Sequence, residues 1–332
     1  MLKGKALLNK TFFNRALTNK LLLSIAVTIL ISCNVHAADS RAEKSTTLNS
    51  SAAAEADITA QPIQKSVLDE RDEMVDKSTD NPFSLSQHKL NYILPFTYVS
   101  DPNTLDSDGL NTQNVDHVEA KYQISVKFPI YQAKLNTSGL YLGFTAVSFW
   151  QAYNKEVSKP FRETNYEPEL FYSWRSDFSF AGFKFNQVRL GLNHQSNGQS
   201  GLRSRSWNRL YASAMFSDDD SYYYLKLWYR FKESEKEDPF DQVGDDNPDI
   251  THFMGYGELG YGTKLGAFNI TALVRNNLKS NDNKGSIELN LSYPINERYD
   301  ILLQYFNGYG DSLIDYNRHQ KRIGLGIQLK FL

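Results

Sequence analysis

The feature that most constrains the fold is a repeated alternation of apolar and polar residues, in segments of about ten residues each. In the clearest example, one side of the pattern is apolar and comprises Tyr122, Ile124, Val126, Phe128 and Ile130. Residues 223–229, 287–293 and 323–331 repeat it. Because successive side chains of a strand point to opposite faces, each segment predicts a β-strand with one apolar face. About twelve such strands fit between His88 and Leu332.

A soluble sandwich shows the same alternation, so two further features decide between it and a transmembrane barrel. Aromatic residues recur near the predicted strand ends, where an interfacial girdle would lie, at Tyr122, Tyr131, Trp150, Trp174, Tyr229, Tyr293 and Tyr305. Connections also alternate in length. Long polar ones at 101–114, 154–165, 197–206, 231–249, 279–285 and 308–318 are separated by short turns. These features predict an all-β fold, a twelve-stranded antiparallel transmembrane β-barrel with both termini periplasmic.

The bilayer requires the predicted sheet to close, because each unpaired backbone group would cost several kcal/mol without water. Charged residues then fall on the inward side of the strands, at Lys121, Lys127, Glu167, Glu169 and Arg209. They must pair with one another or with water. We therefore expect a filled polar interior rather than an open pore.

The N-terminus has the pattern of an export signal. Basic residues precede the apolar run 21–31, and Val35-His36-Ala37 is a cleavage-site pattern, so residues 1–37 are predicted to be a signal peptide. A membrane anchor is the alternative reading of the run. Leu30-Ile31-Ser32-Cys33 also resembles a lipoprotein box, in which Cys33 would be lipidated. Because Cys33 is the one cysteine, the mature chain would contain no disulfide.

Residues 38–84 are rich in small, polar and charged residues with no sustained period, which predicts a disordered polar extension. A barrel plug is the alternative for this segment. The barrel domain is expected to span residues 85–332. The formal net charge of −2 gives no indication of nucleic-acid binding.

The segment Asn193-His194-Gln195-Ser196-Asn197-Gly198 carries the candidate chemistry. His194 and Ser196 have the same parity as Val188, Leu190 and Leu192, which places both on the apolar, lipid-facing side. Asn208 opens the next predicted strand, where a hairpin brings its amide beside His194. Together these groups form a candidate site in which His194 is the base, Ser196 the nucleophile and Asn208 the orienting amide.

A neutral asparagine stabilises an imidazolium less than a carboxylate does, so this chemistry requires strong oxyanion stabilisation. Loss of one oxyanion donor typically reduces the rate by about 10² to 10³. The loop 199–206 contains Ser204 and Ser206, whose oxygens are ligands of the type that Ca²⁺ accepts. A solvated turn is the alternative for this loop. Polar side chains that face lipid are costly, which favours a function for His194 and Ser196.

Five motifs carry a family resemblance, namely residues 160–168, 193–198, 204–209, 245–249 and 308–316. Over residues 88 to 332 the chain resembles the outer membrane phospholipase A family. The resemblance implies a calcium-dependent enzyme of the bacterial outer membrane, with its site on the outer-leaflet side. It also implies hydrolysis of sn-1 and sn-2 acyl esters of glycerophospholipids and lysophospholipids, and activation by formation of a homodimer.

Residue roles follow from the same resemblance. His194 matches the family base, Ser196 the nucleophile and Asn208 the orienting amide. The calcium ligands would be Ser204, Asp246, the backbone carbonyl of Gln199, and a hydroxyl matched by Ser158 that each subunit contributes to its partner.

Two positions depart from the family. Ala146 stands where the resemblance leads us to expect a glutamine that hydrogen-bonds across the dimer interface. Gly201 stands where some members of the family have an aspartate that helps to hold calcium in the monomer. These changes bear on dimer strength and calcium affinity. A non-enzymatic barrel, either a pore or an adhesin, is the competing class. An outer-membrane protease fits less well, because the sequence does not suggest the acidic groups of such a site at the outer-leaflet ends of the predicted strands.

Overall fold

The structure is a computed structural model that describes residues 85–103, 115–133, 138–156, 159–176, 178–218, 220–238, 240–241 and 243–330. The predicted signal peptide and polar extension lie outside these residues, as does Ser158. Those assignments stay predictions.

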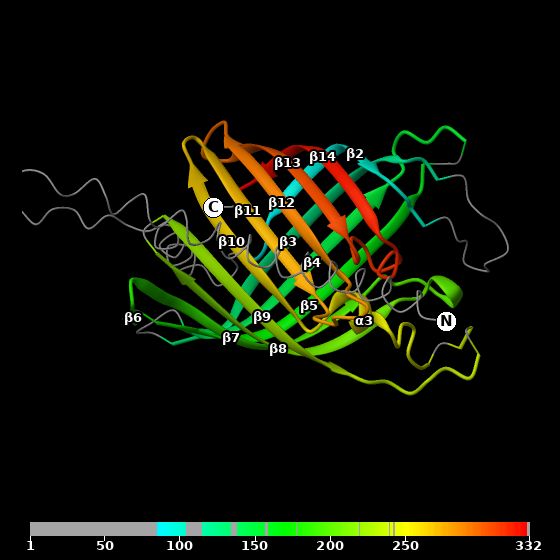
Figure 1. The fold of residues 1–332 in the computed structure, drawn as a ribbon, viewed down its shortest axis with the longest axis horizontal. Helices are drawn as coiled ribbons and strands as arrows, with labels where there is room; N and C mark the ends of the chain where they lie inside the picture. The colour runs from blue at the N-terminus through cyan, green and yellow to red at the C-terminus, as the bar shows by residue number, and fades with distance from the viewer. Residues whose placement is uncertain are drawn as a thin grey trace, which may run out of the picture. The chain divides into compact units, whose positions relative to one another are not determined.

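Twelve long strands form a closed antiparallel ring in the described part of the chain (Figure 1). They are β2 (Asn91–Val99), β3 (Val118–Gln132), β4 (Gly139–Trp150), β5 (Phe161–Arg175), β7 (Phe183–Ser196), β8 (Ser206–Ser217), β9 (Ser221–Phe231), β10 (Gly257–Leu265), β11 (Phe268–Asn276), β12 (Gly285–Pro294), β13 (Tyr299–Gly308) and β14 (Gln320–Leu329). Successive strands pair, and β14 returns to β2, with Ile327 opposite Ile93. The predicted twelve-stranded antiparallel barrel is confirmed.

Smaller elements complete the described fold. The two-residue strands β1 (Ser86–Gln87) and β6 (Ser179–Phe180) pair with β3 and β7. A 3₁₀ turn covers Gly201–Arg203, and α3 covers Ile250–Met254. Among the described residues, none of the helical segments has the length and apolar character needed to cross a bilayer.

The strands are apolar outside and polar inside. On β7, Leu190 and Leu192 are 46% and 50% exposed, whereas the neighbouring Asn193 is 3% exposed. The exposed leucines belong to the outer wall, because a barrel strand alternates between its two faces. The observed strand bounds also preserve the alternation of long and short connections, with the shortest between β10 and β11 at residues 266–267.

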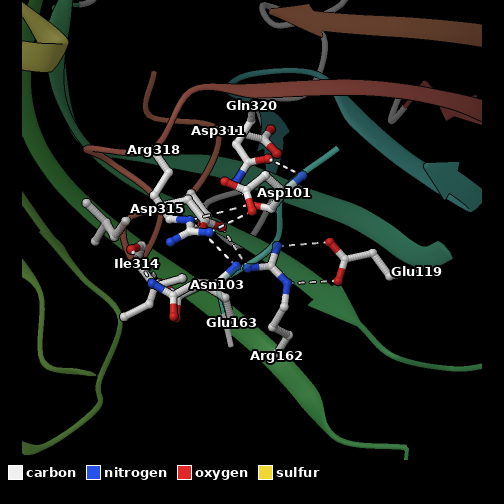
Figure 2. A network of polar contacts seen from close by, with 12 residues as sticks. Asp101, Asn103, Glu119, Arg162, Glu163, Asp311, Ile314, Asp315, Arg318 and Gln320 are labelled. Carbon is white, nitrogen blue, oxygen red and sulfur yellow. Dashed lines mark hydrogen bonds and ion pairs between the residues drawn. The ribbon is translucent and has the colours of Figure 1, made fainter. Parts of the chain in front are cut away.

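Buried ion pairs form a network inside the barrel, and Figure 2 shows the part of it around Arg162 and Asp315. Arg162 lies between two carboxylates, with Nη2 at 2.9 Å from Glu119 Oε1 and Nη1 at 2.7 Å from Asp315 Oδ2. The Asp311 carboxylate accepts from Arg322 Nε at 2.6 Å and from Lys121 Nζ at 3.1 Å. We call this set the interior ion network; it comprises Glu119, Lys121, Arg162, Asp311, Asp315 and Arg322. It fastens the connection between β13 and β14 to the barrel wall.

A second group of charges lies deeper and includes residues that precede β2. His88 Nε2 lies 2.6 Å from Glu169 Oε2, and Lys89 Nζ lies 2.6 Å from Glu167 Oε2. Arg209 also reaches Glu167, at 3.2 Å. The predicted filled polar interior is therefore confirmed, and part of the filling comes from the chain just before the barrel.

One predicted connection is too long. Residues 154–165 were expected to form a loop because they lack apolar alternation, but β5 already begins at Phe161. Its inward side chains Arg162, Glu163 and Asn165 are buried among polar partners, while Phe161 is 51% exposed. A β-bulge at this point places Arg162 and Glu163 in succession on the inner face, which interrupts the two-residue alternation.

Asp311 provides a test of the interior ion network. Burial disfavours its charged form, but Arg322 and Lys121 outweigh that effect and hold the pKa of its carboxyl below the usual value. Asp311→Asn removes the charge that compensates two buried cations, and we expect a loss of about 3 kcal/mol in the free energy of unfolding. Urea titration of the refolded barrel in detergent measures this loss.

The wild-type contribution of Asp311 is present at neutral pH and disappears as pH falls through its depressed folded-state pKa. Asp282→Asn is the matched control, because Asp282 pairs with Lys284 at an exposed site, where such pairs contribute little. Equal unfolding midpoints for the two variants would contradict this account of the network.

Candidate active site

Strand register brings the predicted catalytic residues to one patch of the outer wall. On β7 and β8, His194 lies opposite Asn208, and Ser196 lies opposite Ser206. His194 is exposed and shares the face of Leu192, whereas Trp207 on the other face of β8 is buried. The imidazole therefore points outward, as the sequence parity predicted.

The histidine and the asparagine form a direct hydrogen bond. His194 Nδ1 and Asn208 Oδ1 are 2.8 Å apart. Because an amide oxygen can only accept, this contact places the proton on Nδ1 and leaves Nε2 as the basic nitrogen. The other end of the amide is also engaged, since Asn208 Nδ2 donates to Glu233 Oε1 at 2.8 Å.

Ser196 lies two residues from His194 on the same strand face, but its hydroxyl has a different partner. The backbone N–H of Gly198 donates to Ser196 Oγ at 3.1 Å. Within the described residues, no hydrogen bond joins Ser196 to His194. Nucleophile and base are often loosely aligned in a site without substrate. The structure thus pairs His194 with Asn208 and leaves the Ser196 hydroxyl on the adjoining backbone.

Asn197, whose side chain is buried, organises the loop that follows the candidate nucleophile. Its Nδ2 donates to Arg203 O at 2.7 Å, and its Oδ1 accepts from Arg205 N at 2.9 Å. These two contacts close residues 197–205 into a compact turn. Gly198 has φ +63°, a conformation that favours glycine.

Two of the candidate metal ligands, Ser204 and Asp246, are in direct contact, and Ser206 joins them. Asp246 Oδ2 accepts from Ser204 Oγ at 2.7 Å and from Ser206 Oγ at 3.3 Å. Its other oxygen, Oδ1, lies 2.5 Å from Lys236 Nζ, and both side chains of this ion pair are about nine-tenths buried. Asn247 Oδ1 accepts from Ser206 N at 3.0 Å, which fastens residues 245–249 to β8.

The oxygen atoms of Ser204, Ser206 and Asp246 are suitable ligands for a hard cation, but they do not complete a coordination shell. Hydroxyl and carboxylate oxygens are the donors that Ca²⁺ prefers, and the ammonium of Lys236 already provides positive charge at the carboxylate. The described residues contain no group of three or more His, Cys, Asp or Glu side chains arranged to hold a metal. Additional ligands would have to be backbone carbonyls, hydroxyls or water. Gln199 is exposed in the same loop as Ser204.

Two residues of this region, Glu233 and Lys236, were not predicted from the sequence. The first could have been found by counting, because Asn208 lies opposite Phe231 and Glu233 follows Phe231 by two residues. Nothing in the sequence indicates that Lys236 returns to Asp246, since that contact depends on how the connection between β9 and α3 folds.

The fold defines a class, that of transmembrane barrels, and the outer wall of this one carries a hydrogen-bonded His194–Asn208 pair. The family described as phospholipase A1 matches residues 68–329. Phospholipase A1 of Escherichia coli strain K12 is 41% identical over 255 residues, which cover 76% of this chain and 84% of that protein.

Two solved structures are also similar. An active-site mutant of outer membrane phospholipase A from E. coli is 40% identical, with a TM-score of 0.67, covering 76% of this chain and 93% of that one. A calcium-bound dimer of the Salmonella typhi outer membrane phospholipase is 39% identical, with a TM-score of 0.66, covering 75% and 93%. The chain belongs to the phospholipase A1 family. The family match begins at residue 68, whereas the resemblance noted from the sequence begins at residue 88.

The role of Asn197 in the loop can be tested without reference to activity. Asn197→Ala removes the acceptor of the Arg205 N–H and the donor to Arg203 O. We expect a local loss of about 2 kcal/mol, which corresponds to roughly thirtyfold faster amide exchange over residues 198–205. Hydrogen–deuterium exchange measured by mass spectrometry reports this change.

Asn296→Ala is the control, because its side chain caps a turn at residues 296–299 in another connection. That variant should leave exchange over residues 198–205 unchanged. Wild-type protection of these residues in Asn197→Ala would show that the loop is held by other contacts.

Proposed function

We propose that this outer-membrane phospholipase hydrolyses sn-1 and sn-2 acyl esters of phospholipids with Ser196 as nucleophile, His194 as base and Asn208 as orienting amide. The observation that carries the proposal is the 2.8 Å hydrogen bond from His194 Nδ1 to Asn208 Oδ1 on the lipid-facing wall. A site in this position meets a membrane lipid without drawing it into the barrel.

The steps follow from the positions of the protons. His194 Nε2 accepts the proton of the Ser196 hydroxyl as Oγ attacks the ester carbonyl, and the ester C–O bond then breaks. His194 returns the proton to the departing alcohol, which leaves an acyl group on Ser196. Water, deprotonated by His194, releases the fatty acid. Asn208 keeps Nδ1 protonated throughout, so that Nε2 alone exchanges protons.

Ser196 must leave its contact with Gly198 to engage His194. The freed N–H of Gly198 then lies beside the nucleophile, where it can donate to a developing oxyanion. The residues that would hold Ca²⁺ are Ser204, Asp246 and the carbonyl of Gln199, together with Ser158 of the partner subunit. When bound, the ion adds positive charge near the developing oxyanion.

We further propose that the enzyme acts as a homodimer and that its site lies at the outer-leaflet side of the membrane. The S. typhi relative was solved as a dimer with calcium, which supports a homodimer here. Ala146 lies on β4 between Ile124 and Tyr166, so this position of the outer wall offers no side-chain amide to a partner. We infer that apolar contact, rather than a hydrogen bond at this position, would join the subunits.

A pore is the weaker alternative for this chain. The interior ion network and the group around Glu169 occupy the lumen with buried charges. An open channel would instead expose such charges to water.

Ser196→Ala tests the nucleophile. Without the hydroxyl no acyl-enzyme forms, and we expect fatty-acid release from mixed micelles with Ca²⁺ to fall by about 10³-fold or more. Excess chelator should abolish release by the wild type. Ser179→Ala, which changes an exposed serine on β6, is the control and should retain wild-type release. Calcium-dependent release by Ser196→Ala at the wild-type rate would refute the proposal.

Lys236→Met tests whether the Lys236 ammonium competes with Ca²⁺ for the Asp246 carboxylate. The ion pair with Asp246 must open before that carboxylate can bind Ca²⁺, so its removal should lower the Kd for Ca²⁺ by about tenfold. Lys236→Arg preserves the charge and should leave the Kd close to that of the wild type. Isothermal titration of the detergent-solubilised protein measures both. A weaker or unchanged affinity in Lys236→Met would mean that Asp246 is not a calcium ligand.

A further inference from the structure

The side-chain amide of Asn208 can adopt two orientations, and its hydrogen bond with His194 alone does not select between them. An amide has an oxygen on one side and an NH₂ group on the other, and rotation by 180° exchanges them. Only the oxygen can accept from His194 Nδ1–H. The rotated amide would present its NH₂ group to Nδ1 and favour the tautomer that protonates Nε2, which removes the base. A neighbouring group must therefore select one orientation.

Glu233 is placed to make that selection. Its Oε1 lies 2.8 Å from Asn208 Nδ2, on the side of the amide away from His194. An ionised carboxylate only accepts hydrogen bonds, so it attracts the NH₂ group and repels the amide oxygen. The orientation with Oδ1 toward His194 satisfies both neighbours, whereas the rotated amide satisfies neither.

The register makes this contact a consequence of the barrel wall. His194 on β7 lies opposite Asn208 on β8, and Asn208 lies opposite Phe231, the last residue of β9. Glu233 follows Phe231 by two residues, just past the end of β9, and its contact with Asn208 places its carboxylate at the outer face. In the described part of the chain, Asn208 is its one hydrogen-bond partner, and Glu233 forms no ion pair there.

The carboxylate also adds a negative charge that the amide lacks. Proton transfer from Ser196 turns His194 into an imidazolium, and Asn208 is neutral. A carboxylate hydrogen-bonded to the far end of the amide polarises it and increases the negative charge on Oδ1. We propose that Glu233 is a positioning residue that fixes the Asn208 amide and the His194 tautomer and supports the imidazolium. This inference rests on the proposed Ser196–His194–Asn208 mechanism.

A series of substitutions at Glu233 tests the proposal through the order of kcat values. Glu233→Gln keeps an acceptor without the charge and should lower kcat least. Glu233→Ala removes the acceptor and should lower kcat by roughly fivefold to tenfold. Glu233→Lys places a donor where only an acceptor fits, favours the rotated amide, and should lower kcat most. KM should stay near the wild-type value in all three, because Glu233 does not contact the ester.

The matched control is Glu235→Lys. Glu235 is exposed in the same connection, and in the described structure it has no hydrogen bond or ion pair. It undergoes the same charge change without touching Asn208, and kcat should remain at the wild-type value. An equal loss in Glu235→Lys and Glu233→Lys would overturn the proposal, because surface charge alone would then explain the effect.

Asn208→Asp gives a second readout that a merely structural role would not change. Either oxygen of the introduced carboxylate accepts from His194 Nδ1–H, so there is no amide to orient. Glu233→Ala in that background should cause no loss of kcat. An equal fold-loss in both backgrounds would overturn the proposal.

Different results would contradict the catalytic role of Ser196 and the positioning role of Glu233. Wild-type release by Ser196→Ala would remove the catalytic mechanism. An inactive Ser196→Ala together with wild-type kcat in both Glu233→Ala and Glu233→Lys would remove only the role of Glu233.

Discussion

The two-residue alternation of a closed membrane sheet is the constraint on which the rest of this structure depends. With no water to satisfy a free edge, the strands close on themselves, and every residue then faces either lipid or lumen. His194 and Ser196 share the parity of Leu190 and Leu192 on β7, so the same alternation that makes the wall apolar also presents the candidate chemistry to the bilayer.

The lumen serves the outer wall by holding it rigid. The interior ion network joins β3, β5 and β14 to the connection after β13, and the cost of burying its charges is offset by close pairing. Burying such ions gains little stability compared with apolar packing, but removing one partner leaves an uncompensated charge. The site is formed across β7, β8 and β9, and the second group of interior charges ties two of these strands to β5, through Arg209 with Glu167 and Lys226 with Glu169.

The sequence predicts the features of this protein that depend on local properties of the chain, but not those that depend on tertiary contacts. The barrel, its strand number and the outward direction of His194 follow from parity and connection length, because both are local properties of the chain. The start of β5 was misplaced, because a β-bulge puts Arg162 and Glu163 in succession on the inner face and interrupts the two-residue alternation. The contacts of Glu233 and Lys236 were missed for a different reason. Both belong to the long connection after β9, whose path is set by tertiary contacts such as that of Arg230 with Asp245, at 2.5 Å.

The central claim is that Ser196 is activated by an outward-facing imidazole, and covalent labelling tests it most directly. Alkylsulfonyl fluorides react with activated serines, and one with a long alkyl chain matches a fatty acyl group in length. Peptide mapping by mass spectrometry after treatment in Ca²⁺ should find one adduct, on Ser196, and none in a His194→Ala variant. An unlabelled wild type, or an adduct on a different serine, would contradict the account.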